Sequence, residues 1–447
     1  MPTLPRASAR AFRSLLRKCL PGRSRGPVPA VLFQAQGDTL TLLADTGEVI
    51  LRLTAPNASA EGSFLLPATV LEEVEGNADD VEFVPKAKAK ALARWSDRGV
   101  PKEIAIPLLP PKQAPSLPAL PEVWGEASAA LLAALYEAGR SAGREPGRYA
   151  TQRIQVRGVQ GQILSTDCHQ ALIQGGFTFP FPETLHVPAV PVFAAKELAG
   201  LPVRIGRSET HFVVEVGPWT IWLTIDRLAR FPEIEAAVPK AKGATVITFS
   251  ETDAAFLLDR LPQFPGHDED SAPITLDIDS RGVAVRGRAK RNDTPAEVIL
   301  RGSTTTGPPV RLALDRRFLI RALSIGFRRL RLSERANAFA AIADDRIYLA
   351  AVLDPSACVG PHDTVPAETL ESLPVPLEAT MPKNAEPEPS NPDLLAEAEG
   401  LRLALLELAQ RAGRLIALLK SRKKDERVLS QVWSSLKSLQ LGGGPPR

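Results

Sequence analysis

The fold prediction depends most on the stretch Ser165-Thr166-Asp167-Cys168-His169-Gln170-Ala171-Leu172. It closes a run of alternating apolar and polar residues from Ile154 to Ile173, a pattern that is typical of a β-hairpin. A short amphipathic helix is predicted before this run, from Ser128 to Arg140, and a strand after it, from Leu185 to Pro188. The predicted order is therefore helix, hairpin, strand ending near a proline, and a second short helix.

The same order of elements returns before and after this segment, about 120 residues away in each direction. In the first copy the helix runs from Ala9 to Leu20 and the hairpin from Ala30 to Leu53. The strand from Phe64 to Pro67 then leads to a second helix. The third copy has the same layout, with the ranges Thr252 to Leu261, Ile274 to Leu300, Val310 to Leu314 and Arg316 to Ile325.

Three copies of one unit predict an α+β fold of three tandem domains, each with two helices and antiparallel sheets. The predicted domains are residues 1–121, 122–241 and 242–355. Six prolines fall between 107 and 121, so the end of the first domain is predicted to be a stiff linker without regular structure.

Composition sets broad limits on the function. The chain has 447 residues, 44% of them hydrophobic, and a net charge of +3. No apolar run approaches the roughly 18 residues of a membrane span, so we expect no membrane partner and a cytoplasmic location. Cys19, Cys168 and Cys358 are far apart and the five histidines are scattered, which indicates unpaired thiols, no metal site and no cofactor.

The first 26 residues contain six arginines, one lysine and no acid, which has two interpretations. One is an Arg-rich targeting peptide. The other is a structural helix, because helical spacing gathers Arg10, Arg13 and Arg17 on one face and apolar residues such as Phe12 and Leu16 on the other. We favour the helix, since it occupies the first helical position of the first repeat.

Two motifs carry a resemblance to a known family. The stretch 165–172 resembles the Ala-Thr-Asp-Gly-His-Arg-Leu-Ala signature of the bacterial sliding clamp, the beta subunit of DNA polymerase III. The decapeptide from Arg230 to Pro239 is similar to that family's Arg-Phe-Pro-Asp-Tyr-Arg-Arg-Val-Leu-Pro. Residues 311–353 follow the layout of the family's last strand, helix and strands, so the resemblance covers about residues 9–355.

The resemblance implies a DNA replication processivity factor and not an enzyme. Family members pair head to tail into a homodimeric ring of six domains around double-stranded DNA, with helices lining the central hole. They tether DNA polymerases and repair proteins through a cleft between the second and third domains. The same partners are expected here.

The residues themselves give no catalytic constellation. Asp167 and His169 invite an acid–base interpretation, but no nucleophile with an orienting partner accompanies them. A hydrogen-bonding role near a turn is the alternative that we favour. No glycine-rich phosphate loop precedes a lysine and a hydroxyl residue, so nucleotide hydrolysis is not predicted.

The predicted DNA-facing surface carries mixed charge. By the resemblance, the arginines that would face DNA are Arg10, Arg13, Arg17, Arg316, Arg317 and Arg321. Acidic residues lie on or next to the same set of helices, namely Glu72, Glu73, Glu75, Glu251, Asp253 and Asp259. A mixed lining predicts weak, salt-sensitive contact with phosphates. It suits a ring that encloses DNA, and equally a clamp-fold interaction scaffold that no longer encircles DNA.

The partner-binding cleft can also be carried over by position. Its predicted residues are Thr166, His169, Gln170, Ala171, Pro232, Ala236, Ala237, Leu349, Ala351 and Leu353. Gln170 and Ala236 stand where the family has arginine, and Ala171 and Ala351 where it has larger apolar side chains. Since each missing methylene removes about 0.8 kcal/mol of apolar contact, the usual partner peptide is expected to bind weakly.

The chain continues well past the last predicted strand. Residues 356–390 are rich in proline and acids and are predicted to be a disordered linker. Residues 391–441 carry two apolar stripes at heptad spacing, which predict a helical hairpin or coiled coil. Packing against the body is one role for these helices. Self-association or partner binding is the role we favour.

Overall fold

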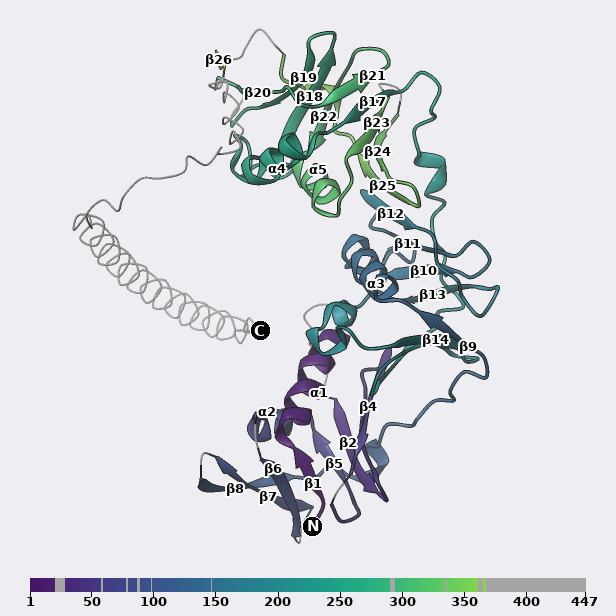
Figure 1. Cartoon of the computed structure of the whole chain (residues 1–447), viewed down its shortest axis with the longest axis vertical. Helices are drawn as coiled ribbons and strands as arrows, with labels where there is room; N and C mark the ends of the chain where they lie inside the picture. Colours follow the sequence, from purple (N-terminus) through teal and green to yellow (C-terminus); the bar gives the residue numbers. More distant parts are fainter. Residues whose placement is uncertain are drawn as a thin grey trace, which may run out of the picture. The chain divides into compact units, whose positions relative to one another are not determined.

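The computed structural model describes residues 1–20, 29–57, 59–77, 79–86, 89–97, 99–145, 147–289, 294–333 and 336–360, and the backbone of 365–366. The predicted helices of residues 391–441 and most of the predicted linker 356–390 lie outside the described residues. The described part is α+β and is built mainly from antiparallel sheets, as predicted (Figure 1). The boundaries of the three domains remain a prediction, and below we call residues 1–121, 122–241 and 242–355 the first, second and third segments.

The first segment contains both of its predicted helices and the predicted hairpin. Its helices are α1 (Arg6–Cys19) and α2 (Thr69–Val74). Its strands are β1 (Thr3–Pro5), β2 (Ala30–Gln36), β3 (Thr39–Asp45), β4 (Val49–Pro56), β5 (Gly62–Pro67), β6 (Asp80–Lys86), β7 (Lys90–Asp97) and β8 (Val100–Pro107). A 3₁₀ turn, η1 (Pro111–Gln113), opens the linker.

Within its described residues, the second segment has one α-helix, α3 (Ala129–Ser141). Its strands are β9 (Trp124–Ala127), β10 (Arg153–Arg157), β11 (Gln162–Thr166), β12 (Gln170–Gln174), β13 (Thr184–Pro188), β14 (Val203–Arg207), β15 (His211–Val216) and β16 (Trp219–Thr224). Its 3₁₀ turns are η2 (Pro191–Ala194), η3 (Lys196–Leu198) and η4 (Glu235–Ala237).

The third segment has the helices α4 (Glu251–Arg260) and α5 (Arg316–Ser324) and the 3₁₀ turns η5 (Leu261–Gln263) and η6 (Pro355–Ala357). Its strands are β17 (Thr245–Thr248), β18 (Pro273–Asp279), β19 (Gly282–Gly287), β20 (Ala296–Leu300), β21 (Thr304–Thr306), β22 (Val310–Asp315), β23 (Arg329–Leu332), β24 (Ala338–Ile342) and β25 (Arg346–Ala351). A two-residue strand, β26 (Val365–Pro366), pairs with β20.

The prediction of two helices in every repeat is wrong in the second segment. The residues after Pro188 form η2 and η3 instead of an α-helix. Ala195 between them has an extended backbone, with φ −71° and ψ 132°, and it interrupts the run after barely one turn. Each turn is too short to form the hydrogen-bond ladder that makes an α-helix cooperative.

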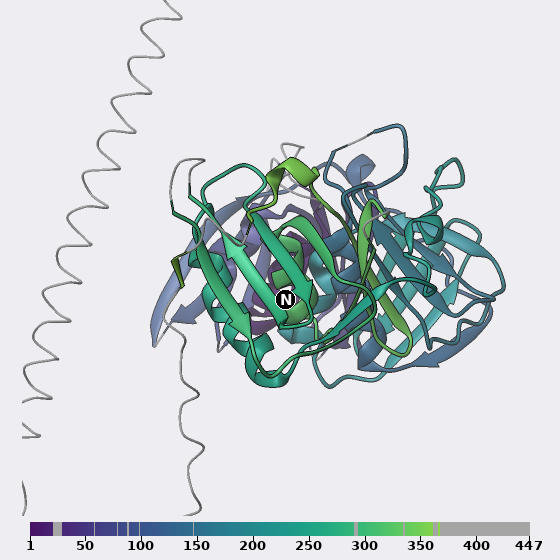
Figure 2. The same cartoon turned by 90° about the horizontal axis from the view of Figure 1, so that it is seen from above.

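Two sheets continue across the segment boundaries (Figure 1 and Figure 2). In the eight-stranded sheet, β4 of the first segment pairs with β16 of the second, with Leu53 opposite Trp219. In the nine-stranded sheet, β12 of the second segment pairs with β25 of the third, with Ala171 opposite Leu349. Backbone ladders therefore join neighbouring segments, and the second junction positions the candidate site.

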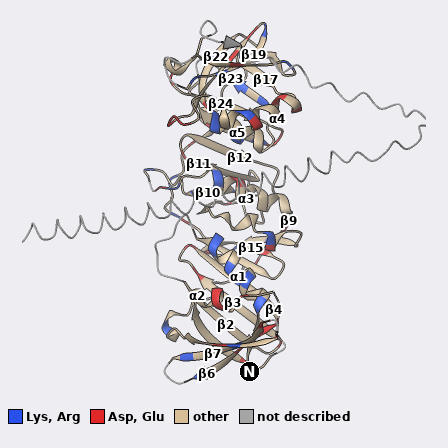
Figure 3. Ribbon diagram, turned by 90° about the vertical axis from the view of Figure 1, so that its left-hand side faces the viewer, with Lys and Arg blue, Asp and Glu red and all other residues tan. Residues whose placement is uncertain are grey.

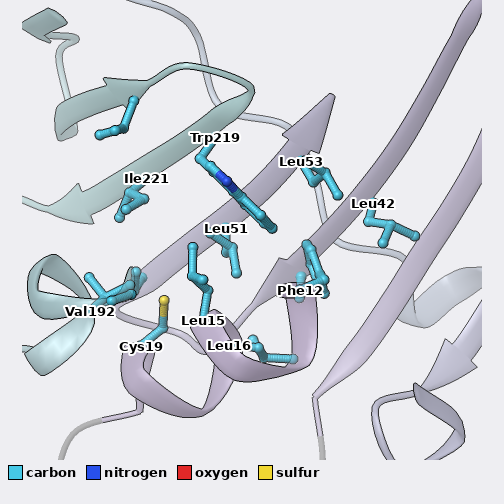
Figure 4. Packing of buried hydrophobic residues seen from close by; sticks show 14 of the residues in the cluster. Phe12, Leu15, Leu16, Cys19, Leu42, Leu51, Leu53, Val192, Trp219 and Ile221 are labelled. Atoms are coloured by element: carbon cyan, nitrogen blue, oxygen red, sulfur yellow. The ribbon is translucent and has the colours of Figure 1, made fainter. Parts of the chain in front are cut away.

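The N-terminal helix is a packed element of the core, as its helical spacing predicts. Phe12, Leu15 and Cys19 are fully buried, and they pack on Leu51 and Trp219 of the eight-stranded sheet (Figure 4). The Phe12 and Trp219 rings are stacked with 6.3 Å between their centroids. Because α1 supplies apolar side chains to a core shared with the second segment, it is an integral part of the fold.

Candidate functional site at a strand junction

A tight turn between β11 and β12 shapes one end of the candidate site. The Thr166 hydroxyl donates to the Gln170 carbonyl oxygen at 2.7 Å and accepts from the Cys168 N–H at 3.0 Å. Asp167 Oδ1 accepts from the N–H groups of His169 and Gln170, each at 2.8 Å. The hydrogen-bonding role predicted for Asp167 is confirmed, and the turn fixes the path of the chain from Thr166 to Ala171.

The predicted cleft residues meet at a cavity of about 940 Å³. Nine of the ten line it: Thr166, His169, Gln170, Ala171, Pro232, Ala236, Ala237, Leu349 and Ala351. They come from β11, β12, the loop around η4, and β25, so residues far apart in sequence converge on one hollow. Leu353 is not among the lining residues, because the chain turns away after β25 and its N–H donates to the Ala313 carbonyl oxygen at 2.7 Å.

Strand alternation decides which side chains face the cavity. Ala171 and Leu349 pack with Ile234 in a small apolar cluster on the cavity side of the sheet. Leu172 and Tyr348, one position along each strand, belong instead to the core of the third segment. Side chains on neighbouring positions of a strand point to opposite faces of the sheet. A one-residue change of register would therefore turn Ala171 and Leu349 away from the cavity.

Gln170 has a partner on each side, although the resemblance places arginine at this position. Its Nε2 donates to Asp167 Oδ2 at 2.9 Å, and its Oε1 accepts from the Tyr348 hydroxyl at 2.7 Å. Tyr348 is fully buried, so this bond satisfies a hydroxyl that has no access to water. Gln170 therefore links β12 to β25 by a side-chain hydrogen bond, and it also lines the cavity.

Sequence reasoning missed more than half of the lining. The further residues are Cys168, Glu233, Ile234, Val238, Pro239, Lys240, Lys242, Ser333, Ala336, Asn337, Ala338 and Ala350. Those between 233 and 239 lie inside the decapeptide Arg230 to Pro239, so its resemblance to the family motif could have indicated them. Ala338 lines the cavity because it pairs with Ala351 across β24 and β25, and the sequence does not specify this register.

Cys168 offers a direct probe of the cavity, and we expect it to be the first cysteine to react with iodoacetamide at pH 8. Its side chain is exposed, whereas Cys19 is buried and Cys358 is half-buried. Burial raises the pKa of the Cys19 thiol far above its usual range and also raises the pKa of Cys358, so both form less of the reactive thiolate. Peptide mass spectrometry measures the order of labelling, with Cys168→Ser as the control. Labelling of Cys19 in the native protein at a similar rate would contradict the packing of α1.

The assignment of Arg316 to the DNA-facing set is wrong. Its side chain is 1% exposed, and its guanidinium donates to five backbone carbonyl groups, those of Leu261, Phe264, Pro265, Ala272 and Pro273. Arg316 lies three and seven residues before Leu319 and Leu323, so it shares their buried helix face. It cannot contact a phosphate on the surface.

Three more of the predicted arginines are engaged by acids. Arg13 pairs with Glu72 at 2.9 Å and with Glu75 at 3.2 Å. Arg317 pairs with Asp315 at 2.5 Å. Arg321, with 10% of its side chain exposed, pairs with Glu137 of α3. Figure 3 shows the basic residues of α1 in blue and the acidic residues of α2 in red.

Arg10 and Arg17 are the two predicted arginines that are exposed and have no carboxylate partner within the described residues. Arg10 donates to the side-chain oxygen of Asn77, which carries no charge. Helix α1 therefore keeps two of its three surface arginines available to an anionic partner.

Among all the residues that the structure describes, no cluster of three or more metal-ligating side chains is found, and no helix is both long and apolar enough to cross a membrane.

No protein-family model matches the chain, and no curated protein matches it in sequence. Solved structures do match. The chain is similar to the DNA polymerase III beta subunit of Pseudomonas aeruginosa, with a TM-score of 0.66, 17% identity, and coverage of 78% of this chain and 99% of that one. It is also similar to the beta chain of Streptococcus pneumoniae (TM-score 0.66, 13% identity) and to that of Thermotoga maritima (0.65, 13%), each with coverage of 79% and 99%. The chain has the sliding-clamp fold, which confirms the resemblance at the level of fold.

Proposed function

We propose that this protein is a clamp-type DNA polymerase accessory factor of the bacterial cytoplasm. In this proposal the cavity at the β12–β25 junction holds a peptide of a partner protein, and two copies close head to tail around duplex DNA. The observation that carries it is the convergence of nine predicted cleft residues on one cavity in a chain with the sliding-clamp fold. The predicted domain boundaries, and partner contact by residues 391–441, belong to the same proposal.

The first and third segments each offer an edge strand for head-to-tail pairing. Strand β8 is at an edge of the four-stranded sheet, and β20 borders only the two residues of β26 on its outer side. Each strand carries an exposed apolar side chain, Val100 at 59% and Ile299 at 54%. Open edge strands with apolar residues readily pair with another chain, so β8 of one copy and β20 of another are the edges we expect to meet.

The neutralised arginines support a second candidate function, a clamp-fold scaffold that binds proteins and no longer encircles DNA. Of the six arginines expected to face DNA, one is buried and three pair with acids. An ion-paired arginine releases few counterions on binding a phosphate, so it adds little to DNA affinity. Both candidates use the same cavity, and they differ in whether a ring forms around DNA.

Retention on DNA separates the two candidates. If the full-length protein encloses DNA, it should stay with a circular plasmid through gel filtration in 0.5 M salt and should be released when a restriction enzyme linearises that plasmid. Arg10→Ala with Arg17→Ala should also flatten the dependence of log affinity on log salt by about 0.9 for each phosphate that is no longer neutralised. The matched control is Arg301→Ala with Arg329→Ala, since both arginines are exposed, lie outside the helices and pair with no carboxylate within the described residues. Equal retention on circular and linear DNA, or none on either, would favour the scaffold.

A further inference from the structure

One wall of the cavity is a loop that is held on the sheet by two side-chain contacts. We call residues 230–239 the wall loop. Near its start, the Phe231 ring stacks on the His186 imidazole of β13, with 5.9 Å between the ring centroids. Four residues later, the Glu235 carboxylate of η4 pairs with the Arg157 guanidinium of β10. Phe231 also packs on the small apolar cluster of the cavity, so the first contact lies directly behind the cavity.

Gln155 joins the two contacts into one network. It is 8% exposed and lies opposite His186 across the β10–β13 pair. The Arg157 Nε–H donates to Gln155 Oε1 at 2.7 Å, and Gln155 Nε2 lies 3.0 Å from His186 Nε2. On its other side Gln155 is opposite Leu164 of the cavity cluster, so the network is on the cavity face of the sheet. Both ends of the wall loop are therefore attached to the same connected set of side chains.

The direction of these hydrogen bonds fixes the protonation state of His186. A guanidinium can only donate, so the Gln155 atom that faces Arg157 is the amide oxygen. The amide nitrogen of Gln155 then faces His186, and it too can only donate. His186 Nε2 must therefore accept, which requires a neutral imidazole with its proton on Nδ1. A proton on Nε2 would place two donors face to face.

The charges around the imidazole do not favour a proton on it. The nearby carboxylate of Asp226 is already paired with Arg153, at 3.3 Å, and Arg153 also pairs with Glu48. Arg157, the nearby cation, is held by its partner on the wall loop. Burial lowers the pKa of His186; the Asp226 carboxylate raises it in part, and the Arg157 guanidinium lowers it again. The neutral state that the hydrogen bonds require is thus also the state that burial favours.

We propose that neutral His186 is a positioning residue for the cavity wall and that its protonation releases the wall loop. A protonated imidazole loses the Gln155 bond. If Gln155 turns its oxygen toward His186, it loses the Arg157 bond, so either response breaks the network. A free histidine titrates near pH 6.5, so the wall is ordered above this pH and loosens as the pH falls below about 6. The inference rests on the proposed function, because it gives a pH response to the cavity that is proposed to hold a partner peptide.

Two measurements on the full-length protein without any peptide test this proposal. With ¹⁵N-labelled histidine, the NMR signal that disappears in His186→Gln should show the Nδ1–H tautomer at pH 7.5. The N–H groups of Ala237 and Val238 donate to carbonyl oxygens within the wall loop at 3.1 and 3.2 Å, so their exchange reports its order. After correction for the intrinsic effect of pH, their protection should fall about tenfold between pH 7.5 and 5.5. In His186→Gln, whose amide oxygen can accept from Gln155 and does not titrate, it should stay constant.

His211→Gln is the matched control. His211 is also half-buried, with a pKa that burial lowers, but it lies on β15 outside the network. This variant should keep the fall in protection of the wild type. An Nε2–H tautomer at His186, no fall in the wild type, or the same fall in His186→Gln would each overturn the proposal. Because no peptide is present, these results do not depend on whether the cavity binds one; a wall that responds to pH in a protein that binds no peptide would count against the proposed function alone.

Discussion

Replacement of Arg316 by alanine is expected to lower the free energy of opening of the third segment by about 4 kcal/mol. The guanidinium is buried and links η5, the loop after it, and the start of β18 through their carbonyl groups, with Nε 2.9 Å from the Ala272 oxygen and Nη2 3.0 Å from the Pro273 oxygen. Removing it takes one donor from each of the five carbonyl groups; the Leu261 and Ala272 oxygens keep the backbone N–H groups of Phe264 and of residue 316 as donors. Each acceptor that is left unsatisfied costs about 1–3 kcal/mol before water enters. Partial access of water keeps the expected total below the sum.

Arg317→Ala is the matched control for this experiment. Arg317 is the next residue of the same helix, but 62% of its side chain is exposed, and its ionic partner Asp315 lies two residues away. We expect its loss to cost less than about 1 kcal/mol, as for other surface ion pairs. Hydrogen exchange read by mass spectrometry over residues 261–324 measures both variants, because the described third segment contains no tryptophan for fluorescence. Similar exchange rates in the two variants would contradict the role given to Arg316.

The helical periodicity of the sequence is sufficient to predict which of these two arginines is buried. Residues 316 and 317 differ by 100° around a helix, so they cannot share one face. The apolar residues Leu319 and Leu323 already indicate that the buried face includes position 316. The same periodicity predicts α1 correctly, since Arg10 and Arg17 are exposed there and Phe12 and Leu16 are buried. The information was therefore present in the pattern of α5.

Other features could not be derived from local patterns. The convergence of the cavity residues follows from β12 pairing with β25, a contact between residues about 180 positions apart that no local periodicity encodes. It could be predicted only because two motifs resembled a family in which those regions meet. The departure at η2 and η3 is of another kind: the repeat predicted a helix, and the backbone leaves helical geometry at Ala195.

Helices α3 and α5 are joined by one ion pair, and its removal gives the second large expected effect. Arg321 of α5 pairs with the Glu137 carboxylate of α3, and its Nη2 also donates to the Glu137 backbone oxygen at 3.2 Å. The side chains are 10% and 24% exposed, so both charges are largely withdrawn from water. Deleting one member of such a pair leaves the other charge without compensation.

Glu137→Leu should therefore destabilise the junction by about 3 kcal/mol, at the lower end of the range for buried pairs because a quarter of the carboxylate side chain is exposed. Glu137→Leu combined with Arg321→Met should recover most of the loss, since two apolar side chains of similar volume need no partner. A double-mutant cycle built on hydrogen exchange in β12 and β25 measures the coupling between the two positions. If the double variant is no more stable than Glu137→Leu alone, the ion pair is not what joins the two helices.

The same cycle bears on the cavity, because α3 and α5 pack on the sheet face opposite to the cavity wall. Gln174 of β12 donates to the Ala134 carbonyl oxygen of α3 at 2.8 Å, and Tyr348 of β25 belongs to the core that includes α5. Opening the helix pair therefore loosens the two strands that carry Ala171 and Leu349. We expect Glu137→Leu to speed hydrogen exchange in the turn from Thr166 to Ala171 on the cavity side, and the double variant to restore the slower exchange. Faster exchange in α3 and α5 with no change in this turn would mean that the two faces of the junction are energetically independent.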